Sequence, residues 1–409
     1  MKHTMRRSLL FVPVLAAFCA NTLVASNCPL TLSPLLREVS FQGSAPGPVT
    51  GHHILIFDDT ATTFSAPHYT NPDIPQVGKR YPTAFTKANT PQVQMKFELE
   101  VDIPEGETCT ATVKASGTDG VNLPVQTFTL LDGKNTYTYG WNTADGAFPD
   151  KIRFYGPGEG TFEFDWKIKV NTDGADFQSF HKSKHRIYLT SGTPIPSQGN
   201  RETLFYYACH KPDGNAGVDG KIVTHLIWDD FATKAMKRIN HTTGILYGPD
   251  LQFTVQGGDI LVNGRGVCAT WSALFRDVLS VHAYSSEMVE VDSHGITLPD
   301  GSTPSNTAWL VSQQTVVDST TVVPGPLGVN RGQGNAHGST AWSAHAIAKA
   351  FGELFDASYG IGQCTDQASY EASAISGFSF DSDPDIFGNS HVEYMAKDVF
   401  SRLNYTYVP

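Results

Sequence analysis

The chain has 409 residues, and its 29 lysines and arginines against 40 aspartates and glutamates give a formal net charge of −11. An acidic chain of this kind is not expected to bind nucleic acid through its bulk charge. Its contents of apolar (40%) and charged (17%) residues predict a folded chain with a large core rather than a disordered one. At roughly 100–200 residues per domain, the length favours two domains.

Residues 1–26 are typical of a secretory signal peptide. Lys2, Arg6 and Arg7 precede an apolar run at 9–19, and small residues at 24–26 suit a cleavage site. We therefore expect a secreted or periplasmic protein. No later stretch has the roughly 20 apolar residues that a membrane-spanning helix needs, so no membrane span is expected.

Residues 27–195 show the pattern of a β domain. Apolar residues alternate with polar ones at 93–101 and 162–170, which is typical of half-buried strands. Shorter strand-like runs at 109–115, 127–130, 137–141 and 187–190 are separated by Asp-Gly and Gly-Pro turns. Many short strands with frequent turns predict an antiparallel β-sandwich.

The segment 190–200, rich in Pro, Ser and Gly, is the expected linker to a second domain at 196–372, with 373–409 as a C-terminal extension. Apolar residues at helical spacing predict helices over 224–240 and 267–281. Strand-like runs follow at 287–291, 308–317, 345–350 and 354–358, the last two joined by a hairpin at 351–353. The second domain is therefore expected to be α+β.

Two long loops interrupt this second domain. They cover residues 292–307 and 318–342 and are rich in Gly, Pro, Ser and Thr. Loops of this length in a compact domain are usually functional or mobile. We expect both to flank the active cleft and to set specificity.

The cysteines bear directly on function. Cys19 leaves with the signal peptide, and an odd number remains. An exported protein tends to pair its cysteines, so an unpaired one is a partner-seeking thiol or a nucleophile. Pairing Cys28 with Cys109 and Cys209 with Cys364 would keep each disulfide within one domain, although spacing alone does not determine connectivity.

Cys268 is the candidate nucleophile, because it lies in the first turn of the predicted helix 267–281, where the helix dipole favours a thiolate. His345 opens one strand of the predicted hairpin and Asp356 closes the other, so both lie at the same end. A carboxylate there can accept the imidazole Nδ1–H and orient the ring, which predicts a Cys268-His345-Asp356 triad. His337, in a turn-like run, is an alternative base.

These residues lie in two patches that resemble the transglutaminase-like superfamily. The first patch is the run 266–275 around Cys268, and the second runs from His345 to the segment 355–360. Residues 332–335 (Gly-Gln-Gly-Asn) look like a segment of secreted bacterial members, some of which carry an N-terminal β-sandwich. The resemblance implies a papain-like thiol fold, with Cys268 as nucleophile, His345 as general base and acid, and Asp356 as the group that orients the imidazole.

A thiolate with a histidine base attacks an acyl carbon and forms a thioester, which water or an amine resolves. The resemblance favours hydrolysis of amide or peptide bonds over transamidation. A catalytically inactive exported binding or adhesion protein is the remaining alternative. Gln256 is a speculative oxyanion donor. We expect a protein or peptide substrate and no cofactor. No metal is expected either, since the run from Asp381 lacks the glycine and glutamate of a calcium loop.

Overall fold

The structure is a computed structural model. It describes residues 28, 30–41, 54–59, 62–64, 67–71, 81–156, 160–170, 176–197, 199–239, 244–248, 257–293, 301–302, 305–311, 314–318, 321–324, 332–334, 341–381, 392–396 and 404–408. The fold is mixed α+β and rich in strands, which form several antiparallel sheets, as the sequence predicts at this level. The signal-like residues 1–26 lie outside the described part of the chain. Among the described residues, no helix is long and apolar enough to cross a membrane.

Two antiparallel four-stranded sheets make up most of the N-terminal region. The first has the strand order β2 (Tyr69–Thr70), β1 (Leu30–Phe41), β4 (Gln92–Val101), β7 (Gly133–Thr143). The second has the order β10 (Gln178–His185), β9 (Phe162–Val170), β5 (Thr110–Gly117), β6 (Leu123–Thr129). A 3-10 turn (Thr118–Gly120) follows β5.

Alternation along these strands explains their shared core. In β4 the residues from Val93 to Val101 at every second position are buried, and in β9 the same holds from Phe162 to Ile168. Both sets belong to one apolar cluster, and each large side chain buried there contributes about 1.5–3 kcal/mol. Trp166 is part of this core and donates its Nε1–H to Ser183 Oγ (2.8 Å).

A small sheet joins the N-terminal region to the helices that follow. It has the order β3 (Thr83–Thr86), β11 (Ile187–Thr190), β8 (Arg153–Tyr155). Phe154 stacks on Tyr188 with ring centroids 5.3 Å apart, and Tyr188 contacts Phe205 of α1 at 5.9 Å. The apolar core of the C-terminal region therefore includes residues that precede the expected linker.

The helices match the sequence only in part. The described ones are α1 (Glu202–His210), α2 (Gly220–Ala232), α3 (Gly257–Asn263), α4 (Cys268–Ser280) and α5 (Gln367–Ala374). The helix expected at 267–281 is confirmed as α4. The helix expected at 224–240 starts earlier and ends at Ala232, because Lys234 takes a positive φ of 56° that a helix does not allow.

The C-terminal sheets carry most of the remaining strands. The five-stranded sheet has the order β21 (Ile361–Cys364), β20 (Glu353–Asp356), β19 (Ala344–Ala350), β14 (Glu287–Asp292), β24 (Asn404–Val408). A second sheet has the order β18 (Ala341–Trp342), β15 (Ser305–Val311), β22 (Ile375–Asp381), β23 (Val392–Ala396). Two further pairs are β12 (Leu246–Tyr247) with β13 (Arg265–Gly266), and β16 (Gln314–Asp318) with β17 (Thr321–Pro324).

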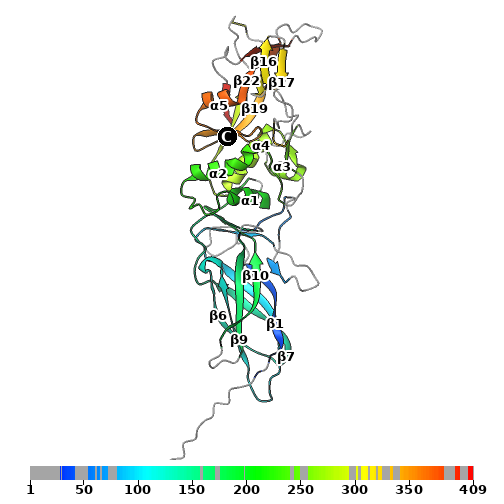
Figure 1. Cartoon of the computed structure of the whole chain (residues 1–409), viewed down its shortest axis with the longest axis vertical. Coiled ribbons are helices and arrows are strands. Elements are labelled where there is room, and N and C mark those ends of the chain that lie inside the picture. The colour runs from blue at the N-terminus through cyan, green and yellow to red at the C-terminus, as the bar shows by residue number, and fades with distance from the viewer. Residues whose placement is uncertain are drawn as a thin grey trace, which may run out of the picture.

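Three expectations from the sequence differ from the structure of these sheets. The strand expected at 308–317 is divided between β15 and β16, and the strand expected at 354–358 ends at Asp356, where a turn begins. Residues 373–409, expected as an extension, supply β22, β23 and β24 to the two larger sheets. Figure 1 shows the N-terminal strands at one end of the long axis, the helices α1 to α4 in the middle and β16 and β17 at the opposite end.

Candidate active site

Cys268 is the first residue of α4, where the chain turns out of β13 into the helix. The preceding residue, Val267, is extended (φ −87°, ψ 177°) and accepts a hydrogen bond from the Thr270 hydroxyl (2.7 Å). A Cβ on Gly266 would lie 2.1 Å from Thr270 Oγ1, so the turn requires a glycine there. A thiol at this position lies at the positive end of the helix dipole, which favours its thiolate form.

His345 and Asp356 lie on the neighbouring strands β19 and β20. The strands are joined by a two-residue turn, Phe351 and Gly352, both with positive φ, as a tight hairpin requires. The register pairs Ala350 with Glu353, so both side chains are at the far end of the hairpin, as the sequence predicts. Both are buried, and α4 packs against the two strands.

The imidazole and the carboxylate form a direct hydrogen bond, and its geometry corrects one detail. His345 Nε2 lies 2.8 Å from Asp356 Oδ2, whereas the sequence argument expects Nδ1 to face the carboxylate. Nδ1 is bonded to the ring carbon nearest the main chain, and the Cys268 sulfur interacts with the backbone N–H of the next residue, Ala346. Nδ1 therefore remains for the thiol, although no hydrogen bond of standard geometry satisfies it among the described residues.

The Asp356 carboxylate is held on both oxygens. Oδ1 accepts hydrogen bonds from the backbone N–H groups of Ser358 and Tyr359 (both 3.2 Å) and from the Ser358 hydroxyl (2.6 Å). Oδ2 accepts one from the Tyr370 hydroxyl (3.2 Å) in addition to the bond from His345. These bonds keep a buried carboxylate ionised and fix its direction.

The three groups shift one another's proton affinities. Burial by itself would raise the pKa of the Cys268 thiol, but the charge of His345, its contact with the sulfur and the Ala346 N–H lower that pKa below its ordinary value of 9.0. Burial by itself would lower the pKa of His345, but the charges of Asp356 and Cys268 raise that pKa to about 10. Burial would also raise the pKa of Asp356, and His345 and Ser358 lower it. These directions favour a thiolate beside an imidazolium more than in isolated groups, and they keep the Asp356 carboxylate ionised.

Aromatic rings shield the imidazole. Trp342 of β18 stacks on His345 with centroids 4.7 Å apart and an interplanar angle of 24°. Tyr359 contacts the ring from the turn after β20, at 5.3 Å and 56°. Both aromatic residues are buried. They hold the ring in place and exclude water from its bond to Asp356.

Sequence reasoning gave no role to four residues of this site: Trp342, Ser358, Tyr359 and Tyr370. Ser358 could have been found, since a serine two residues after an aspartate often bonds back to it. Tyr370 could not, because it lies on α5, a helix of low amphipathicity that begins with a capping box between Asp366 and Ser369. Two expected candidates, the oxyanion donor Gln256 and the alternative base His337, lie outside the described residues.

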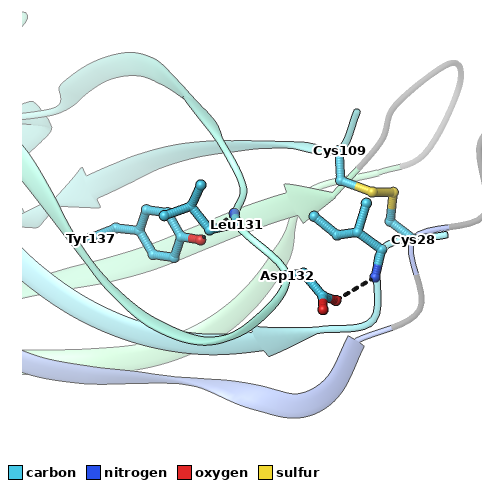
Figure 2. The surroundings of a disulfide bond; sticks show 6 residues. Cys28, Cys109, Leu131, Asp132 and Tyr137 are labelled. Carbon is cyan, nitrogen blue, oxygen red and sulfur yellow. Dashed lines mark hydrogen bonds between the residues drawn. A yellow bond between two sulfur atoms is a disulfide. The ribbon is translucent and has the colours of Figure 1, made fainter. Parts of the chain in front are cut away.

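One disulfide prediction is confirmed and the other is wrong. Cys28 and Cys109 are joined, with Cα atoms 6.1 Å apart, beside the turn that contains Asp132 (Figure 2). Cys209 and Cys364 are both free thiols. Each points its sulfur at a nearby carbonyl, Leu189 O at 3.6 Å and Gly362 O at 3.7 Å, so neither faces the other. Burial raises the pKa of both thiols, which disfavours their reactive thiolate forms.

Potential metal ligands do not cluster in the part of the chain that the structure covers: no group of three or more His, Cys, Asp or Glu side chains there could hold an ion. Of the aspartate run from Asp381, residues 383 and 385 lie outside the described ranges.

Comparisons with known proteins do not assign the chain to a family. No model of a known protein family matches the chain, and no curated protein sequence matches it.

Proposed function

We propose that this protein is a secreted, thiol-dependent acyl-transfer enzyme that hydrolyses amide or peptide bonds, with Cys268 as its nucleophile. The observation that supports this most strongly is a partly buried thiol whose pKa is lowered, next to a buried imidazole whose pKa is raised and which Asp356 orients. Opposed pKa shifts in two neighbouring groups are typical of active sites and cost stability elsewhere.

The reaction follows from these protonation states. The Cys268 thiolate attacks the carbonyl carbon, and the His345 imidazolium gives its proton to the departing amine, which leaves a thioester on Cys268. Neutral His345 then takes a proton from water as the water attacks the thioester. The acid is released and the thiolate and imidazolium are restored. Unpaired backbone N–H groups at the start of α4 can stabilise the oxyanion.

The assignment to a family and a compartment is part of the proposal. A helix that begins with cysteine and packs on antiparallel strands bearing histidine and aspartate agrees with the expected transglutaminase-like core, and the two N-terminal sheets agree with a preceding β-sandwich. The Cys28–Cys109 disulfide supports an oxidising compartment outside the cytoplasm.

Alkylation with iodoacetamide, followed by mass spectrometry at each cysteine, tests the nucleophile. In the wild-type protein Cys268 is expected to react fast near pH 7, while Cys209 and Cys364 stay unmodified. In His345→Ala the half-maximal rate moves to a higher pH, because burial then dominates and raises the thiol pKa. A Cys268 that reacts no faster than a free cysteine at pH 7, or an unchanged profile in His345→Ala, would contradict the proposal.

Hydrolysis itself is tested with unfolded casein, with and without a fluorescent primary amine. Wild-type protein is expected to release new amino termini, and Cys268→Ala to release none at an unchanged melting temperature. Incorporation of the amine without cleavage would show that the reaction is transamidation and not hydrolysis. A fast thiol with neither product on any unfolded protein would favour the non-enzymatic binding alternative.

A further inference from the structure

Residues 332–334 pass between the cysteine side and the aspartate side of the candidate site. The backbone N–H of Gln333 donates to the Ser358 carbonyl (2.9 Å), and the Gln333 carbonyl accepts from the Tyr247 N–H (2.6 Å). The N–H of Gly334 donates to the carbonyl of Lys234 (2.8 Å). This short segment therefore contacts three separate parts of the fold through its main chain.

The glycines on either side of Gln333 allow this close approach. A Cβ on Gly332 would lie 2.7 Å from the Cβ of Tyr247. Gly334 has a φ of +59°, and a Cβ there would lie 2.7 Å from Leu246 Cδ2. Any other residue at either position would push the segment away from β12.

The Gln333 side chain adds a second pair of contacts. It is fully buried, and its Nε2 donates to the carbonyls of Phe231 (2.7 Å) and Ala357 (2.8 Å). Both amide protons are thus used, and a flipped amide would place its oxygen against two carbonyl oxygens. Ala357 lies between Asp356 and Ser358, in the turn whose N–H groups hold the Asp356 carboxylate.

On its other side the segment reaches the approach to Cys268. β12 pairs in parallel with β13, with Tyr247 opposite Gly266, and the N–H of Gly248 donates to the Gly266 carbonyl (3.1 Å). Gly266 precedes the first turn of α4. A continuous set of hydrogen bonds thus runs from the start of α4 through β12 and Gln333 to the turn after Asp356.

We propose that Gln333 is a positioning residue, a cross-brace that fixes the Asp356 turn relative to the start of α4 and thereby aligns His345 with the Cys268 thiol. The inference rests on the proposed function, since it assumes that the thiol and the imidazole act together. Gln333 touches neither of them, so its effect passes through the turn at 357–359 and through β12.

The test compares Gln333→Met with Asn71→Leu. Methionine keeps the length of the side chain and removes both donated bonds. Asn71 is a fully buried amide that donates to the Leu36 carbonyl (2.9 Å) in the N-terminal sheets, so its loss is a matched control far from the site. Iodoacetamide labelling of Cys268 across pH 5–10 and thermal unfolding are measured for both variants.

Gln333→Met is expected to slow Cys268 alkylation at pH 7 by about 10- to 100-fold and to move the half-maximal rate to a higher pH. Asn71→Leu should lower the melting temperature and keep the wild-type alkylation profile. Gln333→Glu covers the case in which the methionine variant does not fold, because its protonated carboxyl can still donate one bond. Its rate should therefore approach that of wild type at low pH and fall further below it as the carboxyl ionises.

Two failures can be told apart. A slow Cys268 in the wild-type protein would refute the proposed function. Fast alkylation of Cys268 in the wild-type protein, together with wild-type pH profiles in the folded Gln333 variants, would refute the positioning role of Gln333. The proposed function would be unaffected.

Discussion

The two halves of the molecule bury different kinds of polar group. In the N-terminal sheets the carboxylate of Glu98 pairs with Arg37 and Lys134, whose side chains reach the surface, and the two cysteines form a disulfide. The C-terminal region buries an ionised carboxylate, an imidazole of raised pKa and two thiols, with the Cys268 thiol partly buried beside them. Buried charges cost stability unless each is paired, so the fully enclosed pair of His345 and Asp356 distinguishes the candidate site from the ion pairs near the surface.

The two halves are nevertheless packed together. Tyr188 of β11 stacks on Phe154 and contacts α1, and His282, just after α4, accepts a hydrogen bond from the Ser191 N–H (3.1 Å) and lies 2.7 Å from the Ala208 carbonyl. A change in one half can therefore be tested for its effect on the other.

The largest expected effect comes from breaking the site alone. Asp356→Asn should lower the rate of the proposed hydrolysis by about 10²–10⁴-fold, because the amide no longer stabilises the imidazolium or orients its ring. Unfolding of the N-terminal sheets should be unchanged. Asp366→Asn is the control, since asparagine caps α5 as well as aspartate does and the rate should stay at the wild-type value. Equal losses in the two variants would count against a specific role for Asp356.

Breaking the N-terminal half is expected to have an intermediate effect. Replacing both Cys28 and Cys109 by alanine should lower the free energy of unfolding by about 2–4 kcal/mol, since the bridge closes a long loop. In the folded protein, Cys268 alkylation should keep its rate and pH profile. Cys364→Ser, which removes a thiol that makes no disulfide, provides the comparison. A change in Cys268 reactivity after loss of the disulfide would show that the two halves are coupled more tightly than their contacts indicate.

The smallest effect is expected at the junction. Burial lowers the pKa of His282 from 6.5 to about 4, so the unfolded chain binds a proton before the folded chain does. Stability from this group is complete above about pH 6.5 and is lost as the pH falls from 6.5 towards 4. His282→Asn, which can still accept from Ser191, should give an acid-unfolding curve with a shallower slope over that range. An identical slope in wild type and variant would show that His282 does not contribute to this pH dependence of stability.

The parts of the site that short-range sequence patterns encode could be predicted. Gly266 and Cys268 mark the start of α4, and the Phe351-Gly352 turn sets which ends of β19 and β20 meet. Tyr370 and Gln333 were beyond prediction, because their contacts join segments that are far apart in the chain. Which His345 nitrogen faces Asp356 also could not be predicted, because it depends on how α4 packs against β19 and β20.

The disulfide expected from the cysteines is confirmed in the N-terminal half and wrong in the C-terminal half. An odd number of cysteines predicts one unpaired thiol, and the structure leaves three. Cys209 and Cys364 escape pairing because each is enclosed by its own neighbours, Cys209 against β11 and Cys364 at the end of β21. The argument from an odd number of cysteines assumes that every accessible thiol forms a disulfide. Burial keeps two of these thiols from doing so.

The place of β24 in the five-stranded sheet has a consequence for biogenesis. Residues 404–408 pair with β14, which in turn pairs with β19, the strand that carries His345. During synthesis the sheet thus lacks its edge strand until this late segment has been made. Until then, β19 lies in a sheet that is incomplete at its edge, and His345 lacks the support of the finished sheet.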